Sequence, residues 1–260
     1  MSVKPYWQSK DGAIEVWNAD TLLALRHIRS MGRRFRCVIM DPPYSSGTRS
    51  EASKSTSGAM VRGARWSAKP IENDQMTTTG FIWLMRETVL ELLDMIDEGA
   101  SLFSFIDWRM WPHLVGALES CNLRVNQMIV WDKLSYGLGH GFRAQHELVV
   151  HASNGTPRVY DHGFGNVLRA RRADNEHHPS PKPPELFEAL LKVATEPGDD
   201  VLDPYGGGGP TLVACHALGR RATMIEGVEE HCRTAVARLG AVANREPVAK
   251  LGPLFAEVQP

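Results

Sequence analysis

The stretch DDVLDPYGGGGPTLVACHALGRRATMIEG, residues 199–227, contains a glycine turn between a short apolar run and a helical pattern. The run 201–203 has the composition of a buried strand ending at Asp203, and Pro210 suits the first position of the following helix. A second apolar run ends at Glu226. Strand, glycine turn, helix and strand in this order are typical of a parallel α/β sheet.

The glycine turn, residues 206–209, predicts a nucleoside ligand, because glycines let a ligand approach the backbone closely. Glu226 follows the turn by about 20 residues, the position of the ribose-binding acid in dinucleotide folds. NAD, FAD and S-adenosylmethionine all suit this pattern, and a tight turn without a ligand is the alternative. A phosphate-binding P-loop is disfavoured, since no Lys-Ser or Lys-Thr pair follows the glycines.

Apolar patterns along the rest of the chain alternate between strand and helix. We expect strands over residues 14–20, 37–40, 100–107, 124–132 and 146–153, and helices over residues 21–32, 80–98, 111–120 and 184–194. This alternation predicts one domain over residues 1–260, with a doubly wound, mostly parallel, Rossmann-like sheet and helices on both faces. Residues 45–79 and 154–177 are polar and lack sustained periodicity, so both are expected as insertions outside the sheet.

The bulk composition excludes several classes of protein. With 43% hydrophobic and 23% charged residues, the chain can bury an ordinary globular core. It contains no apolar run near the roughly 18 to 20 residues of a membrane span, so we expect a cytoplasmic protein without a membrane partner. The four cysteines are scattered without the spacing of a zinc site or a disulfide framework, so no metal is expected.

Two segments are locally basic although the net charge of the chain is −1. Residues 45–70 contain one acid, Glu51, and five basic residues, which are Arg49, Lys54, Arg62, Arg65 and Lys69. Residues 142–172 contain two acids, Glu147 and Asp161, and five arginines, which are Arg143, Arg158, Arg169, Arg171 and Arg172. Contact with the phosphates of a nucleic acid explains such segments, and solvated loops are the alternative.

The sequence Asp41-Pro42-Pro43-Tyr44 ends another short apolar run. Two prolines cannot continue a sheet ladder, so the chain leaves the sheet there in a fixed turn. The turn offers a carboxylate acceptor, the carbonyl of Pro42 and the aromatic face of Tyr44. An exocyclic amine of an extruded base needs such acceptors and a surface for stacking. A rigid turn with a surface tyrosine is the alternative.

With these motifs the chain resembles the β-class DNA amino-methyltransferases, in which the order of motifs is circularly permuted and the cofactor motif comes last. The resemblance covers residues 15–241 and rests on several ordered pieces besides Asp41 to Tyr44. These are Asn18-Ala19-Asp20, Trp131-Asp132-Lys133, residues 139–143, His146-Glu147, residues 178–183, residues 201–209 and Leu218-Gly219-Arg220.

The resemblance implies a role for each matching residue, with S-adenosyl-L-methionine as cofactor. The catalytic residues would be Asp41, Pro42, Pro43 and Tyr44. The cofactor would lie against Asp20, Asp41, Lys182, Asp203, Tyr205, Gly207, Gly209 and Glu226, with Glu226 on the ribose hydroxyls, Asp20 near the adenine ring and Lys182 facing the methionine carboxylate. From the residues alone, Lys182 could equally be a solvated loop lysine. The insertion after Tyr44 is expected as a mobile loop and residues 154–177 as a target-recognition segment, so that Arg49, Arg62, Arg65, Arg143, Arg158, Arg169, Arg171 and Arg172 would contact DNA.

This sequence departs from the family pattern at several positions. It has Tyr205 where Phe is more frequent, Gly208 and Pro210 where the family has hydroxyl residues, and Ser180-Pro181 where it tends to Thr-Gln. These changes keep a tight turn but remove hydroxyl donors.

The expected activity is methylation of the 6-amino group of adenine in double-stranded DNA, because Asp at the first motif position favours adenine in this family and Ser favours cytosine. Cytosine 4-amino methylation, methylation of amides or amines in protein or RNA, and a non-catalytic DNA-binding protein are the alternatives. The sequence leaves open a homodimer, a restriction endonuclease partner and the recognised DNA site.

Overall fold

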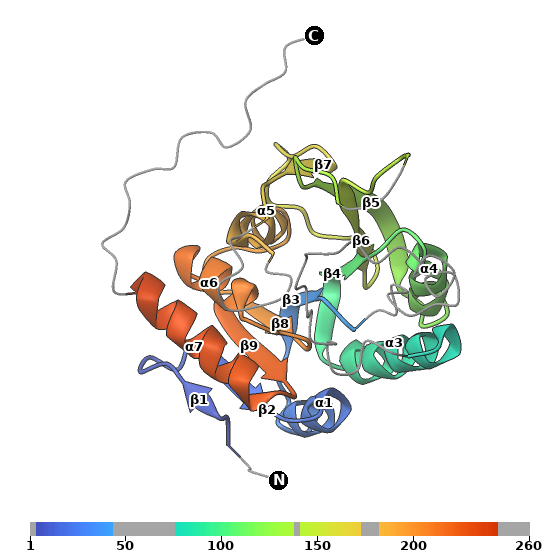
Figure 1. Ribbon diagram of the computed structural model, residues 1–260. Helices are drawn as coiled ribbons and strands as arrows, with labels where there is room; N and C mark the ends of the chain where they lie inside the picture. Colours follow the sequence, from blue (N-terminus) through green and yellow to red (C-terminus); the bar gives the residue numbers. More distant parts are fainter. Residues whose placement is uncertain (1–3, 44–75, 138–140, 173–181, 244–260) are drawn as a thin grey trace, which may run out of the picture.

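The computed structural model describes residues 4–43, 76–137, 141–172 and 182–243. They form one α/β unit around a nine-stranded sheet (Figure 1). In chain order the elements are β1 (Trp7–Gln8), β2 (Ile14–Asn18), α1 (Thr21–Ser30), β3 (Phe35–Met40), α3 (Thr78–Leu93), β4 (Ile96–Ile106), α4 (Trp111–Glu119), β5 (Arg124–Asp132), β6 (His146–Ser153), β7 (Val167–Arg169), α5 (Pro184–Ala194), β8 (Asp200–Asp203), α6 (Pro210–Ala217), β9 (Arg221–Glu226) and α7 (Glu229–Ala243).

The strand order is β1-β2-β9-β8-β3-β4-β6-β5-β7, and β1 and β6 run against the direction of the other strands. Helices α1, α3 and α4 cover one face of the sheet, and α5, α6 and α7 cover the other (Figure 1). The predicted doubly wound, mostly parallel fold is therefore confirmed. No helix in the described ranges is long and apolar enough to cross a membrane.

The sheet has a switch point between β8 and β3. From β8 the chain crosses through α6 to β9, whereas from β3 it crosses through α3 to β4 on the other side. The loops that leave β8 and β3 at their carboxyl ends therefore diverge. Such a point is where open α/β sheets bind their ligands.

The expected helix over residues 80–98 is too long at its carboxyl end. Helix α3 begins at Thr78, capped by the Thr77 side chain, and ends at Leu93, and β4 starts at Ile96. Ile96, at the start of β4, pairs with Phe35 of β3, and in the irregular stretch that follows Gly99 has a φ of +76° and donates its N–H to the carbonyl of Asn154 at 2.7 Å. This pairing joins residues far apart in the sequence, and local periodicity does not report it.

The prediction that residues 154–177 lie outside the sheet is wrong for residues 167–169, while residues 154–166 and 170–172 lie outside the sheet as expected. Residues 167–169 form β7, which pairs in parallel with β5, and Leu168 is buried. The indole N–H of Trp131 donates to the carbonyl of Ala170 at 2.8 Å and holds the end of β7 in place. The other insertion, 45–79, also extends too far, since residues 78 and 79 belong to α3.

Strand β1 was not expected from the sequence. It forms a hairpin with β2 across a turn in which Gly12 has a φ of +68°. Asp11-Gly12 between two apolar runs is a hairpin signal that could have indicated it.

Candidate active site

Four acidic residues lie at the carboxyl ends of four neighbouring strands. Asp20 follows β2, Glu226 ends β9, Asp203 ends β8 and Asp41 follows β3. Because β2, β9, β8 and β3 are adjacent and parallel, all four acids lie along one edge of the sheet. The structure thus brings together residues from both ends of the chain, with Asp203 and Asp41 on either side of the switch point.

The glycine turn after β8 packs tightly against β9 and α7. A Cβ on Gly206 would lie 2.1 Å from Cγ of the buried Met224, and one on Gly209 would lie 2.6 Å from Cβ of Ala235. Gly209 has a φ of +73° and precedes α6, whose first residue is Pro210 as expected. The N–H of Gly207 donates to Oε2 of Glu226 at 2.9 Å. These contacts fix the backbone of the turn beside the end of β9.

Asp203 organises this turn from inside the protein. Its side chain is buried and accepts from the N–H of Tyr205 at 3.1 Å and from the hydroxyl of Thr211. Burial raises the pKa of Asp203 to about 7, although both hydrogen bonds oppose the shift. The carboxyl group therefore supports the turn rather than facing solvent.

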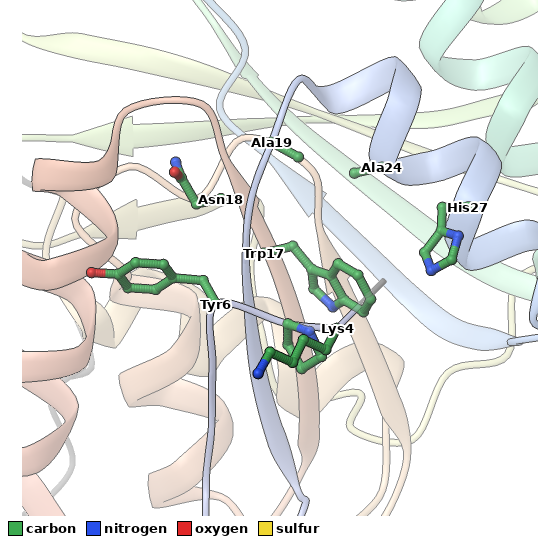
Figure 2. A pocket seen from close by; sticks show the side chains of 8 residues that line it. Lys4, Tyr6, Trp17, Asn18, Ala19, Ala24 and His27 are labelled. Carbon is green, nitrogen blue, oxygen red and sulfur yellow. The ribbon is translucent and has the colours of Figure 1, made fainter. Parts of the chain in front are cut away.

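The far end of the edge is formed by Asp20 and a neighbouring hollow. Asp20 caps α1, accepting from the N–H of Leu23 at 3.1 Å. Next to it, a cavity of 280 Å³ is lined by Lys4, Pro5, Tyr6, Trp17, Asn18, Ala19, Ala24 and His27. Figure 2 shows the Trp17 ring near the His27 ring and the Tyr6 hydroxyl pointing away from both. The cavity borders the place where the resemblance puts the adenine ring.

Tyr205 is anchored to α3 by its hydroxyl group. Its hydroxyl lies 2.7 Å from Oγ1 of Thr88 on α3, and burial raises the pKa of Tyr205 above its ordinary value. The carbonyl of Pro204 accepts from the hydroxyl of Thr21 at 2.9 Å. The turn is therefore tied to helices on the α1 and α3 side of the sheet.

Asp41 forms an ion pair with Lys182 through Oδ2, while its Oδ1 is buried and has no hydrogen-bond partner among the described residues. The Lys182 side chain is 4% exposed, so it is not a solvated loop lysine. Its ammonium lies 4.8 Å from the centre of the Phe105 ring and 3.9 Å from Oε2 of Glu147. Glu147 in turn lies 3.2 Å from Nζ of Lys133, which is also buried.

Burial and neighbouring charge act in opposite directions on this cluster. Burial raises the pKa of Asp41, whose side chain stays 33% exposed, and the Lys182 ammonium opposes the shift. For Glu147, burial alone would raise the pKa, but Lys182 and Lys133 outweigh it and the pKa is lowered. Burial lowers the pKa of Lys133, opposed by Glu147. Two carboxylates and two ammonium groups thus compensate one another.

Three of the arginines expected to contact DNA lie on the same edge of the sheet, around β7 and its carboxyl end. Nε of Arg169 is 3.7 Å from Oδ2 of Asp132, Nη2 of Arg172 is 3.9 Å from Oε1 of Glu147, and Arg171 is exposed. In the loop between β5 and β6, Arg143 stacks on Tyr136 with its guanidinium 3.9 Å from the ring centre.

Arg158 lies elsewhere. Its N–H donates to the carbonyl of Gly99, near the amino end of β4, so it is at the opposite edge of the sheet. The structure does not bring it together with the other candidates. Tyr44, Arg49, Arg62 and Arg65 lie outside the described residues, whereas Pro42 is buried and Pro43 partly buried directly after β3.

Sequence reasoning assigned no role to Glu147 and Lys133. They occupy the matching motifs Trp131-Asp132-Lys133 and His146-Glu147, which begin and end the loop between two paired strands. An acid and a lysine at facing strand ends were the available signal for an ion pair.

The carboxyl ends of the strands beside the switch point form a Rossmann-like site for a nucleoside ligand, because they carry a glycine turn, an acid at a strand end and a buried lysine. The chain belongs to the family described as DNA methylase, whose family model matches residues 35–163 and 157–237.

Individual relatives agree with this family. YubD of Escherichia coli (strain K12), which is named as a methylase, is 26% identical over 205 residues, covering 79% of this chain and 82% of that protein. Type II methyltransferase M2.DpnII of Streptococcus pneumoniae is 41% identical over 64 residues, or 25% of this chain and 24% of that protein.

Solved structures share the fold. The M1.HpyAVI–SAM complex superposes with a TM-score of 0.65 and 20% identity, covering 87% of this chain and 100% of that one. PvuII DNA methyltransferase, which is cytosine-N4-specific, gives a TM-score of 0.68 and 14% identity, covering 93% of this chain and 94% of that one.

Proposed function

We propose that this DNA methylase transfers a methyl group from S-adenosyl-L-methionine to the 6-amino group of adenine in duplex DNA. The observation that carries the proposal is the Asp41 carboxylate beside the switch point, with Oδ1 buried and without a partner among the described residues. A buried acceptor without a donor is costly unless a ligand supplies one. The amine of an extruded adenine is such a donor.

The residues along the edge suit the cofactor. The Glu226 carboxylate, at the end of β9, can accept from the two ribose hydroxyls, and the buried Lys182 ammonium can neutralise the methionine carboxylate. The glycine turn lies beside Glu226, and turns of this kind let a nucleoside ligand approach the backbone. When bound, S-adenosylmethionine supplies an electrophilic methyl group. Transfer of this group needs no covalent intermediate with the protein.

Asp41 and Pro42 then act on the amine. When these two groups accept hydrogen bonds from the amine, its nitrogen becomes pyramidal and its lone pair points toward the methyl group. This offsets the poor nucleophilicity of an amine that is conjugated with its ring. Asp at this position supports adenine, because the family resemblance associates Ser there with cytosine.

The DNA duplex would lie against the edge that carries Arg143, Arg169, Arg171 and Arg172. These side chains are exposed and lie around β5 and β7, at the same edge of the sheet as Asp41, with β4 and β6 between them and β3. Their partial pairing with Asp132 and Glu147 leaves hydrogen-bond donors for phosphates.

The test is to express the protein in cells without endogenous DNA methylation and to digest their DNA to nucleosides for mass spectrometry. We expect N6-methyldeoxyadenosine with the wild type and at most background with Asp41→Ala, because the lost acceptor serves the transition state. Cofactor affinity in Asp41→Ala should stay within about tenfold of the wild type. Detection of N4-methyldeoxycytidine would replace the adenine assignment with cytosine. A protein that binds the cofactor but produces no modified base would be non-catalytic.

A further inference from the structure

Glu147, at the start of β6, is a carboxylate with three cationic neighbours. Its Oε1 lies 3.2 Å from Nζ of Lys133 and 3.9 Å from Nη2 of Arg172, and its Oε2 lies 3.9 Å from Nζ of Lys182. The Lys133 and Lys182 side chains are 6% and 4% exposed, so this pairing takes place largely out of water. A carboxylate in this setting costs free energy through desolvation unless its charge is compensated.

The strand order places Lys182 between two carboxylates. Asp41 follows β3 and Glu147 begins β6, and β4 lies between these two strands. The Lys182 ammonium lies over Phe105 of β4 and contacts Asp41 and Glu147 from this central position. Glu147 therefore attracts Lys182 away from Asp41, and the two carboxylates share one cation.

This sharing matters because Asp41 and the cofactor both require Lys182. A carboxylate held by a buried ammonium is a weaker acceptor for a substrate amine, and an ammonium held by Asp41 is less available to the methionine carboxylate. Both requirements are met if Lys182 passes from Asp41 to the cofactor on binding. The approach of a third carboxylate would then release Asp41 for the amine.

We propose that Glu147 is a positioning residue that holds the Lys182 ammonium between β3 and β6, from where it can pass from Asp41 to the cofactor carboxylate. The inference rests on the proposed function. Without the Glu147 charge, the remaining carboxylate in contact with Lys182 among the described residues is Asp41. Lys182 then settles on Asp41, and cofactor binding must break a stronger ion pair.

Calorimetry with two ligands tests this. S-adenosylhomocysteine carries the amino-acid carboxylate and methylthioadenosine lacks it. We expect Glu147→Gln to weaken S-adenosylhomocysteine binding about fivefold to tenfold and to leave methylthioadenosine binding within about twofold. Glu188→Gln is the matched control, because it removes a carboxylate that pairs with Lys192 within α5. Circular dichroism checks that each variant is folded.

The sign of the effect separates positioning from simple charge removal. Loss of a negative charge near the ligand carboxylate would by itself tighten S-adenosylhomocysteine binding, so tighter binding in Glu147→Gln overturns the proposal. Equal weakening for both ligands overturns it as well, because it would show general damage to the pocket. If the wild type binds neither ligand, the proposed function fails. If the wild type binds both and Glu147→Gln matches Glu188→Gln, only the present inference fails.

A double-mutant cycle tests the partner exchange directly. Asp41→Asn removes the competing carboxylate and should tighten S-adenosylhomocysteine binding about threefold to tenfold, with methylthioadenosine unchanged. In Asp41→Asn/Glu147→Gln, Lys182 no longer has Asp41 to settle on, so the affinity should return to within about twofold of Asp41→Asn. A double variant that keeps the full Glu147→Gln loss contradicts the exchange.

Discussion

At the scale of single residues, Asp203 shows how burial controls protonation beside the candidate site. Its pKa of about 7 lies above the ordinary value of 3.8, so the folded protein favours the protonated carboxyl. The stabilisation from this group is therefore complete below about pH 4, falls as the pH rises toward 7, and is absent above it.

We expect Asp203→Asn to remove this pH dependence, because an amide stays neutral and can still pair with Thr211 and the N–H of Tyr205. The free energy of unfolding of the variant minus that of the wild type should rise between pH 4 and pH 8 by at most about 4 kcal/mol. Urea denaturation at a series of pH values measures the difference. A difference that does not change with pH would show that Asp203 is ionised in the folded protein.

Glu226 supports a prediction on cofactor affinity. Its carboxylate accepts hydrogen bonds from the N–H groups of Gly207 and Val228, which fix its orientation at the end of β9. Glu226→Gln should raise the dissociation constant for S-adenosylmethionine about tenfold or more, because a charged acceptor for the ribose hydroxyls is lost.

The control for this measurement is Glu229→Gln, which changes an exposed carboxylate at the start of α7. Calorimetry that finds equal affinity in the wild type and in Glu226→Gln would move the cofactor away from the end of β9.

At the scale of elements, β7 links the arginines to the sheet. Because β7 pairs with β5, Arg169 is held beside Asp132, and Arg171 follows two residues after the end of this strand. We expect Arg169→Gln/Arg171→Gln to reduce the slope of log affinity for DNA against log salt by about two units if both side chains contact phosphates.

Arg158→Gln is the control for this element, since Arg158 is an exposed arginine at the opposite edge of the sheet. It should leave the affinity and the salt slope unchanged, as measured by DNA titrations at several salt concentrations. If Arg158→Gln has the larger effect, DNA binds at the amino ends of the strands instead.

Elements whose limits are marked locally could be predicted from the sequence. The strands over residues 124–132 and 146–153 and the helix over residues 184–194 agree with the structure to the residue, because glycine, proline or asparagine residues mark the turns beside them. Strand β7 could not be found in this way. It has three residues, and its existence depends on pairing with β5 and on the burial of Leu168.

At the scale of the whole molecule, the sequence predicted which strand ends carry acids but not which side chains meet there. Asp41 and Lys182 are 141 positions apart, and their contact follows from the strand order that places β3, β4 and β6 side by side. The resemblance gave Lys182 a ligand carboxylate as partner, whereas the structure adds two carboxylates of the protein itself. Local patterns hold no information on such competition between partners.

The parallel pairing of β2 with β9 has a consequence for synthesis of the protein on the ribosome. Strand β2 emerges well before β9, its neighbour on the sheet, which ends at Glu226. Between them the nascent chain carries β2 with one edge open, which invites pairing with other chains. The acids of the edge come together only after β9 is released, so polypeptides that terminate early lack half of the site however well their first strands fold.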